Sequence, residues 1–220
     1  MSAASTIAKL SSTLGTLVPR GCAFAVTAVD GSHVAKLSQR EHAWSVDWGV
    51  HRLQEFAAGR FCAHSALAQL QVVCDDLLPD ARGLPVWPEC VLGSISHSRG
   101  IALAVLTRNA PPRLLGVDLE KTNRLSVAAI QKVVHPLEMD FVAGDQLRAS
   151  VLFSLKEAFY KAQFAHCRTD GNFQDLALAL DMQSGVARVL LLERRFATEL
   201  QHLNFRFRLV DDYVLSLCWL

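Results

Sequence analysis

The spacing of apolar positions divides the first half of the chain into strand-like and helix-like segments. The run Cys22–Val29 is apolar and partly β-branched, which predicts a strand. From Trp48 to Val73 apolar residues recur at helical spacing, which predicts one long helix or two in succession, with Gly59 as a weak point. Two further strands are predicted from "IALAVLT", starting at Ile101, and "LLGVDLE", starting at Leu114.

The second half changes from helical to β periodicity. Helical spacing covers Val127–Val134 and Asp145–Phe164. The last quarter predicts four strands, "FQDLALALD", "VARVLLLE", "LNFRFRLV" and "DYVLSLCWL", with a turn at "DMQSG" between the first two. We therefore predict an α+β fold, with strands in each half and helices packed on them.

Two segments lie outside this pattern of helices and strands. The Pro-containing stretch "RNAPPR", Arg108–Arg113, is the best candidate boundary, and it divides the chain into halves 1–110 and 111–220. The first twenty residues are rich in Ser and Thr and lack acids, as in transit peptides. They have no basic stretch followed by a long apolar core, so a secretory signal is not indicated, and we expect a loose N-terminal segment.

Composition excludes several classes of protein. Hydrophobic residues make up 51% of the 220 residues, enough for a sizeable core, and the formal net charge of +1 argues against a duplex nucleic-acid binder. No apolar run is long enough to span a membrane. The cysteines form no CxxC pair, which favours reduced thiols in a cytoplasmic protein; they are Cys22, Cys62, Cys74, Cys90, Cys167 and Cys218.

Asp118 and Glu120 are the first candidate site residues. On a strand their side chains point the same way, and two converging carboxylates repel each other unless a cation lies between them. Such oxygen ligands suit a hard ion such as Mg²⁺. The competing interpretation is a pair of solvated acids at a strand edge. The apolar residues before them, and Gly116, which permits close approach of another group, weigh against it.

The helical stretch "VLFSLKEAFYKAQF" supplies further charges. Glu157 and Lys161 share one face, as in an ordinary helix-stabilising pair. Apolar residues nevertheless fill most of the circumference, so the helix is expected to be buried, and a buried Glu and Lys need partners. A metal for Glu157 and a phosphate for Lys161 would serve. Lys156 points about 100° away from Glu157, toward a ligand or toward water.

Residues of the first half could bind a phosphate-bearing ligand. Ser96 and His97 lie in "GSISHSRG", whose small residues predict a turn approaching a ligand. Arg52 and Arg60 are two helical turns apart and can face the same way, and Arg82 lies in a loop. The alternative is an exposed histidine and a solvated helix face.

Taken in order, "RLQEFAAGR", "RGLPVWP", "GSISHS", "GVDLE" and "FSLKEAFYKA" resemble the 4′-phosphopantetheinyl transferases. The similarity is greatest to the single-chain type that serves siderophore, polyketide and nonribosomal peptide synthesis, and within it to the enterobactin-type branch. The resemblance implies a pseudo-twofold pair of similar α+β halves with the active site between them. It also implies transfer of phosphopantetheine from coenzyme A to a serine of an apo carrier protein, leaving adenosine 3′,5′-bisphosphate.

The resemblance further implies roles for individual residues. Asp118, Glu120 and Glu157 would hold Mg²⁺ or Mn²⁺, and Glu157 or a water held by the metal would be the base. Lys161 would contact phosphate and protonate the leaving group. Coenzyme A would be bound by Arg52, Arg60, Arg82, Ser96, His97, Lys156 and Lys161. One departure is Leu84, where many relatives have a polar residue.

Partners follow from the same resemblance. They are apo carrier proteins or domains of fatty acid, polyketide or nonribosomal peptide synthases, which would meet the segment Arg124–Val142 of a monomer. Two rival functions stay open: another Mg²⁺-dependent phosphoryl-transfer enzyme, and an inactive coenzyme A-binding protein. The first leaves "SISHS" unexplained, and the second leaves the set Asp118, Glu120, Glu157 and Lys161 without a purpose.

Overall fold

A computed structural model describes residues 2–108 and 111–220. The chain forms two compact units, Met1–Pro111 and Pro112–Leu220, and each is considered by itself. Asn109 and Ala110, in the joint expected at Arg108–Arg113, lie outside the described residues, as does Met1. Over the described ranges, no helix combines the length and the hydropathy that crossing a bilayer would require.

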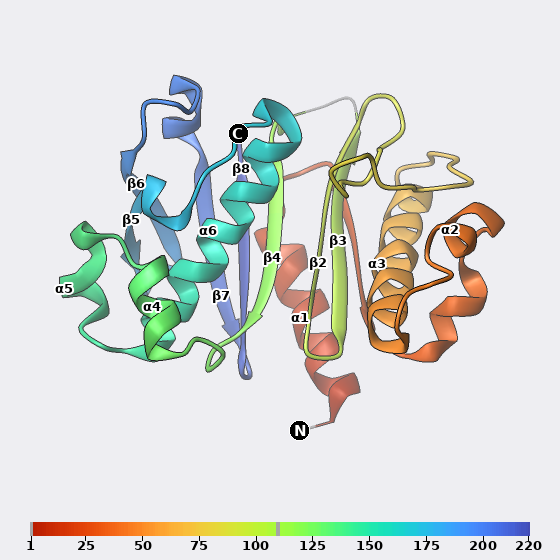
Figure 1. Ribbon diagram of the computed structural model, residues 1–220, viewed down its shortest axis with the longest axis horizontal. Coiled ribbons are helices and arrows are strands. Elements are labelled where there is room, and N and C mark those ends of the chain that lie inside the picture. The colour runs from red at the N-terminus through yellow and green to blue at the C-terminus, as the bar shows by residue number, and fades with distance from the viewer. Residues whose placement is uncertain (1, 109–110) are drawn as a thin grey trace. The chain divides into compact units, whose positions relative to one another are not determined.

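The first unit is a small antiparallel sheet with helices on both sides (Figure 1). Its three strands lie in the order β1-β3-β2, so the hairpin β2–β3 is extended by the earlier strand β1. The elements are α1 (Ala3–Leu17), β1 (Cys22–Ala28), η1 (Gly31–Lys36), α2 (Gln39–Trp44), α3 (Val50–Gln69), β2 (Val91–Ser98) and β3 (Ile101–Arg108).

Small side chains let α3 lie close to this sheet. Ala58 and Ala63 of the helix share a buried cluster with Ala102 and Ala104 of β3. Gly59 belongs to this contact, because a Cβ there would lie 3.0 Å from Cγ2 of Ile95. The long helix predicted here is thus a single helix, and Gly59 lies at its interface with the sheet instead of breaking it.

The N-terminal segment is an ordered helix, so the expectation of a loose segment was wrong. Ser2 caps α1 by accepting a hydrogen bond from the Ser5 amide. Leu10, Leu14 and Leu17 are buried at i, i+4 and i+7, a helical stripe that the Ser/Thr content had obscured. Gly15 lies against the Phe24 ring of β1.

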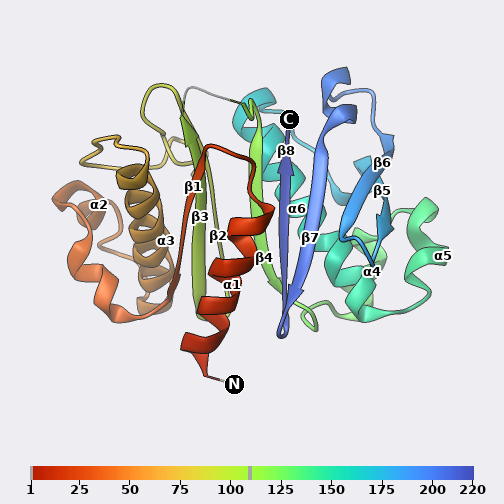
Figure 2. The ribbon, with the colours of Figure 1, turned by 180° about the vertical axis from the view of Figure 1, so that it is seen from behind.

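Helices α1 and α3 cover opposite faces of the first sheet. Ala23 of β1 packs in the cluster that contains α3, whereas the next residue, Phe24, meets α1. Since successive strand residues point to opposite faces, the two helices must lie on opposite sides, as Figure 2 shows.

The second unit is a five-stranded antiparallel sheet in the order β4-β8-β7-β6-β5. The long helix α6 lies on one face, and Figure 2 shows the strands in front of it. The elements are β4 (Leu115–Lys121), α4 (Val127–Val133), η2 (Pro136–Glu138), α5 (Met139–Val142), α6 (Gln146–Cys167), η3 (Phe173–Asp175), β5 (Leu176–Asp181), β6 (Val186–Leu192), η4 (Thr198–His202), β7 (Asn204–Val210) and β8 (Tyr213–Trp219). The predicted α+β class is confirmed, as are the four strands of the last quarter.

One contact fixes α6 on the edge strand β4. A Cβ at Gly116 would overlap the carbonyl oxygen of Ala158 and lie 2.8 Å from the Ala162 amide nitrogen. The helix backbone therefore rests on the strand backbone, which only glycine allows. The close approach expected of Gly116 is confirmed, and the group that approaches it is α6.

The substitution Gly116→Ala should separate α6 from β4, because the clash is with backbone atoms that cannot rotate away. We expect the free energy of unfolding to fall by about 1–3 kcal/mol or more, measured by urea denaturation. Gly49→Ala is the control, since a Cβ there meets nothing within 4 Å; because Gly49 is the N-cap of α3, it should cost no more than about 1 kcal/mol. Equal effects of the two substitutions would contradict the proposed packing.

Candidate active site

The acids of β4 are buried and already hold cationic or hydroxyl partners. Asp118 is 5% exposed. It accepts hydrogen bonds from Nζ of Lys161 at 2.7 Å and from Oγ of Ser154 at 2.9 Å. Lys161 also donates to the carbonyl of Val117 at 3.1 Å. The close contact at Gly116 thus delivers two polar side chains of α6 to one carboxylate of β4.

Glu120 lies two residues further along the same strand face and is 3% exposed. It accepts a hydrogen bond from the Lys121 amide at 2.7 Å and forms an ion pair with Arg124. Both acids of the predicted pair are therefore buried carboxylates, and the interpretation of solvated edge acids does not hold.

Glu157 completes the group, and its ionised form is disfavoured there. Burial raises the pKa of its carboxyl, and the negative charges of Asp118 and Glu120 raise it further, while Lys161 and Arg124 act in the opposite direction. These mutual effects show that the four predicted residues of the second unit, with Arg124 added, form one electrostatic cluster.

The donor set of this cluster suits a hard divalent cation. Three carboxylates offer only oxygen atoms. The repulsion by Asp118 and Glu120, which after burial contributes to the raised pKa of Glu157, is what such an ion would relieve. Over residues 2–108 and 111–220, no three His, Cys, Asp or Glu side chains are arranged ready to hold a metal. Lys161 and Arg124 neutralise Asp118 and Glu120 instead.

Two members of the cluster were missed from the sequence. Ser154 lies three residues before Glu157 and seven before Lys161, so the three share one helix face, and this spacing was visible in advance. Arg124 follows β4 in a turn and had no periodic signal, because its partner depends on how the turn folds.

The arginines of the first unit belong to a stacked row along α3. The Arg52 guanidinium lies 4.2 Å from the ring centroid of Trp48, whose ring meets Phe56 edge-on. Arg60 lies 4.3 Å from the centroid of Phe56. Arg52 and Arg60 therefore lie along the same aromatic row, as their spacing indicated.

Arg60 is buried and already has partners within the protein. Its Nε donates to the Leu77 carbonyl at 2.6 Å, and burial lowers its pKa to about 10, opposed by the charge of Glu41. Arg82, by contrast, is exposed in the loop, where its amide donates to Asp80 at 2.9 Å.

Ser96 and His97 lie on β2, so the predicted turn at these residues was wrong. The turn is made by the next pair, Arg99 and Gly100, both at positive φ. Strand alternation buries Ser96 and exposes His97, whose Nδ1 lies 3.3 Å from Oε1 of Glu55 on α3.

Lys156 is inside the second unit and is not placed to bind coenzyme A or to reach water. Its side chain is fully buried. Its ammonium donates to Glu138 at 2.7 Å and to the carbonyls of Val133 and Phe173 at 2.8 and 2.9 Å. Three donors meet three acceptors, so the expectation of ligand binding was wrong.

Glu138 connects Lys156 to neighbouring segments of the second unit. Its carboxylate also accepts from the amides of Leu178 on β5 and of His135, both at 2.7 Å. The pair thus ties the segment between α4 and α5 to both α6 and the sheet. Burial lowers the pKa of Lys156, and the Glu138 carboxylate counteracts that effect.

Two family models match this chain. The model of the 4′-phosphopantetheinyl transferase N-terminal domain matches residues 46–107, and that of the 4′-phosphopantetheinyl transferase superfamily matches residues 114–218. Together they cover most of the chain, which belongs to the 4′-phosphopantetheinyl transferase superfamily. The resemblance stated from the motifs is confirmed.

Individual relatives span several bacterial groups. The chain is 35% identical over 147 residues to 4′-phosphopantetheinyl transferase Svp of Streptomyces mobaraensis, covering 64% of this chain and 60% of that protein. It is 31% identical over 137 residues to PptT of Mycobacterium tuberculosis, covering 60% of each. It is 33% identical over 144 residues to enterobactin synthase component D of Escherichia coli O157:H7, covering 63% and 64%. The chain thus spans less than two thirds of these relatives.

The substitution Lys156→Met should act on stability. Removing one partner of a buried pair leaves the Glu138 carboxylate uncompensated, and the expected loss is about 3–5 kcal/mol in denaturant unfolding. The double variant Lys156→Met/Glu138→Gln should recover part of that loss. A variant of normal stability with a raised KM for coenzyme A would restore the ligand-binding role.

The substitution Glu157→Gln should stabilise the protein near neutral pH, because it removes a carboxylate whose charge is disfavoured by burial and by the charges of Asp118 and Glu120. The folded-state pKa of Glu157 lies above its ordinary value of 4.5, so wild-type stability falls as pH rises from 4.5 through the folded-state pKa. Unfolding curves from pH 4 to 8 should therefore show the advantage of Glu157→Gln growing with pH. A pH-independent difference would contradict the clustering of the three acids.

Proposed function

We propose that this protein transfers the 4′-phosphopantetheine arm of coenzyme A to a serine of an apo carrier protein, releasing adenosine 3′,5′-bisphosphate. The observation that carries the proposal is the cluster of the buried acids Asp118 and Glu120 with the half-buried Glu157 and Lys161, in a member of this superfamily. Charges collected at this density inside a fold are characteristic of functional sites.

Asp118, Glu120 and Glu157 would hold Mg²⁺, or Mn²⁺ in its place. When bound, the ion neutralises charge on the pyrophosphate of coenzyme A. The three carboxylates would thereby exchange their repulsion and their present cationic partners for shared coordination of one cation.

Glu157 and Lys161 would accept and donate the protons that move during the reaction. Glu157, or a water held by the metal, would accept the proton of the attacking serine hydroxyl. Burial, which disfavours the charge on Glu157, would favour its acting as a base. Lys161, held by Asp118 and the Val117 carbonyl, would contact phosphate and donate a proton to the leaving group.

The first unit would bind the adenosine end of coenzyme A. Arg52 and the exposed Arg82 offer guanidinium groups, and His97 offers a ring nitrogen to a phosphate. Arg60 and Ser96 are buried, so they would support this site from beneath its surface. Arg60 would do so through its contact with the Phe56 ring.

The carrier protein would dock on the segment that the Lys156–Glu138 pair anchors. Val127, Leu137 and Met139 are large apolar side chains left exposed on α4, η2 and α5, and Lys132 is exposed beside them. A mixed apolar and basic surface suits an acidic carrier helix. All six cysteines are free thiols, which supports an enzyme working in the reducing cytoplasm. It would act as a monomer.

The direct test is the mass of an apo carrier protein after incubation with coenzyme A and Mg²⁺. The carrier should gain one phosphopantetheine, and chelation of the metal should prevent the gain. A carrier of unchanged mass, with coenzyme A bound to the protein, would favour an inactive binding protein. Hydrolysis of coenzyme A without transfer would favour a different Mg²⁺-dependent enzyme.

Two variants of the cluster test the two proposed roles: Asp118→Ala tests metal binding, and Lys161→Met tests phosphate contact and proton transfer. Asp118→Ala should abolish transfer, and Lys161→Met should lower turnover by roughly a hundredfold or more, since each removes an interaction with developing charge. Glu193→Ala, at an exposed acid, is the control and should be unaffected. Near-normal turnover of a folded Asp118→Ala variant would contradict the metal assignment.

A further inference from the structure

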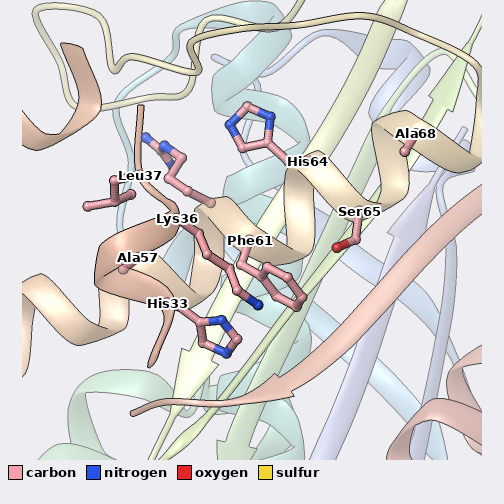
Figure 3. A pocket seen from close by; sticks show the side chains of 9 residues that line it. His33, Lys36, Leu37, Ala57, Phe61, His64, Ser65 and Ala68 are labelled. Carbon is pink, nitrogen blue, oxygen red and sulfur yellow. The ribbon is translucent and has the colours of Figure 1, made fainter. Parts of the chain in front are cut away.

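A pocket in the first unit lies outside the residues proposed for catalysis. It opens between η1 and α3 and has a volume of about 340 Å³, in the range of small-ligand sites (Figure 3). Leu37, Ala57 and Ala68 form apolar parts of its wall. Its polar lining carries basic and hydroxyl groups but no acid: Lys36, His33, His64, Arg60 and Ser65.

An aromatic ring organises the basic side of this pocket. The His33 ring stacks on Phe61, with the ring centroids 4.3 Å apart. The Lys36 ammonium lies 4.2 Å from the same centroid, and Figure 3 shows the three side chains together. Contact with the ring therefore holds the Lys36 cation at the pocket, and the charge of Asp30 also acts on it.

His33 has a buried nitrogen that points to a ligand. The residue is 6% exposed, and its Nε2 lies 3.0 Å from Oγ1 of Thr27. Its Nδ1 is buried and has no hydrogen-bond partner within the described part of the chain. If the Thr27 hydroxyl donates to Nε2, then Nδ1 carries the proton and is a donor awaiting an acceptor.

The acids around the pocket do not supply that acceptor. Asp30, whose charge acts on His33 and Lys36, accepts from the amide and the hydroxyl of Ser32. Glu41 is buried behind the pocket, where one oxygen meets Nε2 of His64 and the Leu77 amide, each at 2.9 Å. Its other oxygen accepts from the Ser38 amide at 3.0 Å. Both oxygens of the Glu41 carboxylate thus already accept hydrogen bonds from the protein. The side chains that line the pocket are left as hydrogen-bond donors for a ligand.

We propose that this pocket binds a small organic anion. Its carboxylate or phosphate group would accept from Lys36 and from Nδ1 of His33, and its apolar body would lie against Leu37, Ala57 and Ala68. The pocket contains none of the residues proposed for metal binding or proton transfer, and of the residues assigned to coenzyme A it includes Arg60 alone.

The test uses benzoate and its neutral analogue benzamide as probes, followed by NMR of the histidine rings of the full-length protein. Benzoate should shift the His33 and His64 resonances saturably, and benzamide should bind at least about tenfold more weakly because it lacks the charge. Lys36→Met, which keeps the side-chain length, should weaken benzoate by a similar factor. Lys9→Met, at an exposed lysine of α1, should leave it unchanged.

Three results would overturn the proposal: no shift at His33, equal binding of benzoate and benzamide, or unchanged binding to Lys36→Met. A further arm adds saturating coenzyme A. Loss of the benzoate shift at His33 would show that the pocket is part of the coenzyme A site and not a separate one. Persistence of the shift supports a separate site whether or not transfer activity is found.

Discussion

The contact between the backbones of α6 and β4 at Gly116 is the constraint on which the candidate active site depends. Any side chain at this position would overlap the Ala158 carbonyl, so glycine sets the distance between helix and strand. At that distance Ser154 and Lys161 reach Asp118, and Glu157 feels the charges of both acids on the strand. A wider separation would let water enter and disperse these interactions.

The two lysines of α6 show how one helix serves both stability and chemistry. Lys156 faces inward and gives all three donors to a carboxylate and two carbonyls, which anchors the segment around Glu138. Lys161 faces β4, is partly exposed, and pairs with a carboxylate that would also be a metal ligand. The first lysine fixes the scaffold, and the second remains accessible to a substrate phosphate.

Much of this could be predicted from sequence because it depends on local periodicity. The strand "LLGVDLE", the helix after Asp145 and the need for close approach at Gly116 all follow from alternation, spacing and the absence of a Cβ. The partner of Lys156 could not be predicted, since Glu138 lies on another element and only the tertiary fold brings them together. Ser96 and His97 were misplaced because small residues suit a buried strand as well as a turn.

The most direct test of this account is a crystal structure with Mn²⁺ and coenzyme A, read by the anomalous scattering of the metal. The account predicts one manganese peak bounded by the carboxylates of Asp118, Glu120 and Glu157, with Lys161 beside a phosphate of coenzyme A. A peak elsewhere, or bound coenzyme A with Lys161 and Arg124 still paired to the acids and no metal between them, would contradict it.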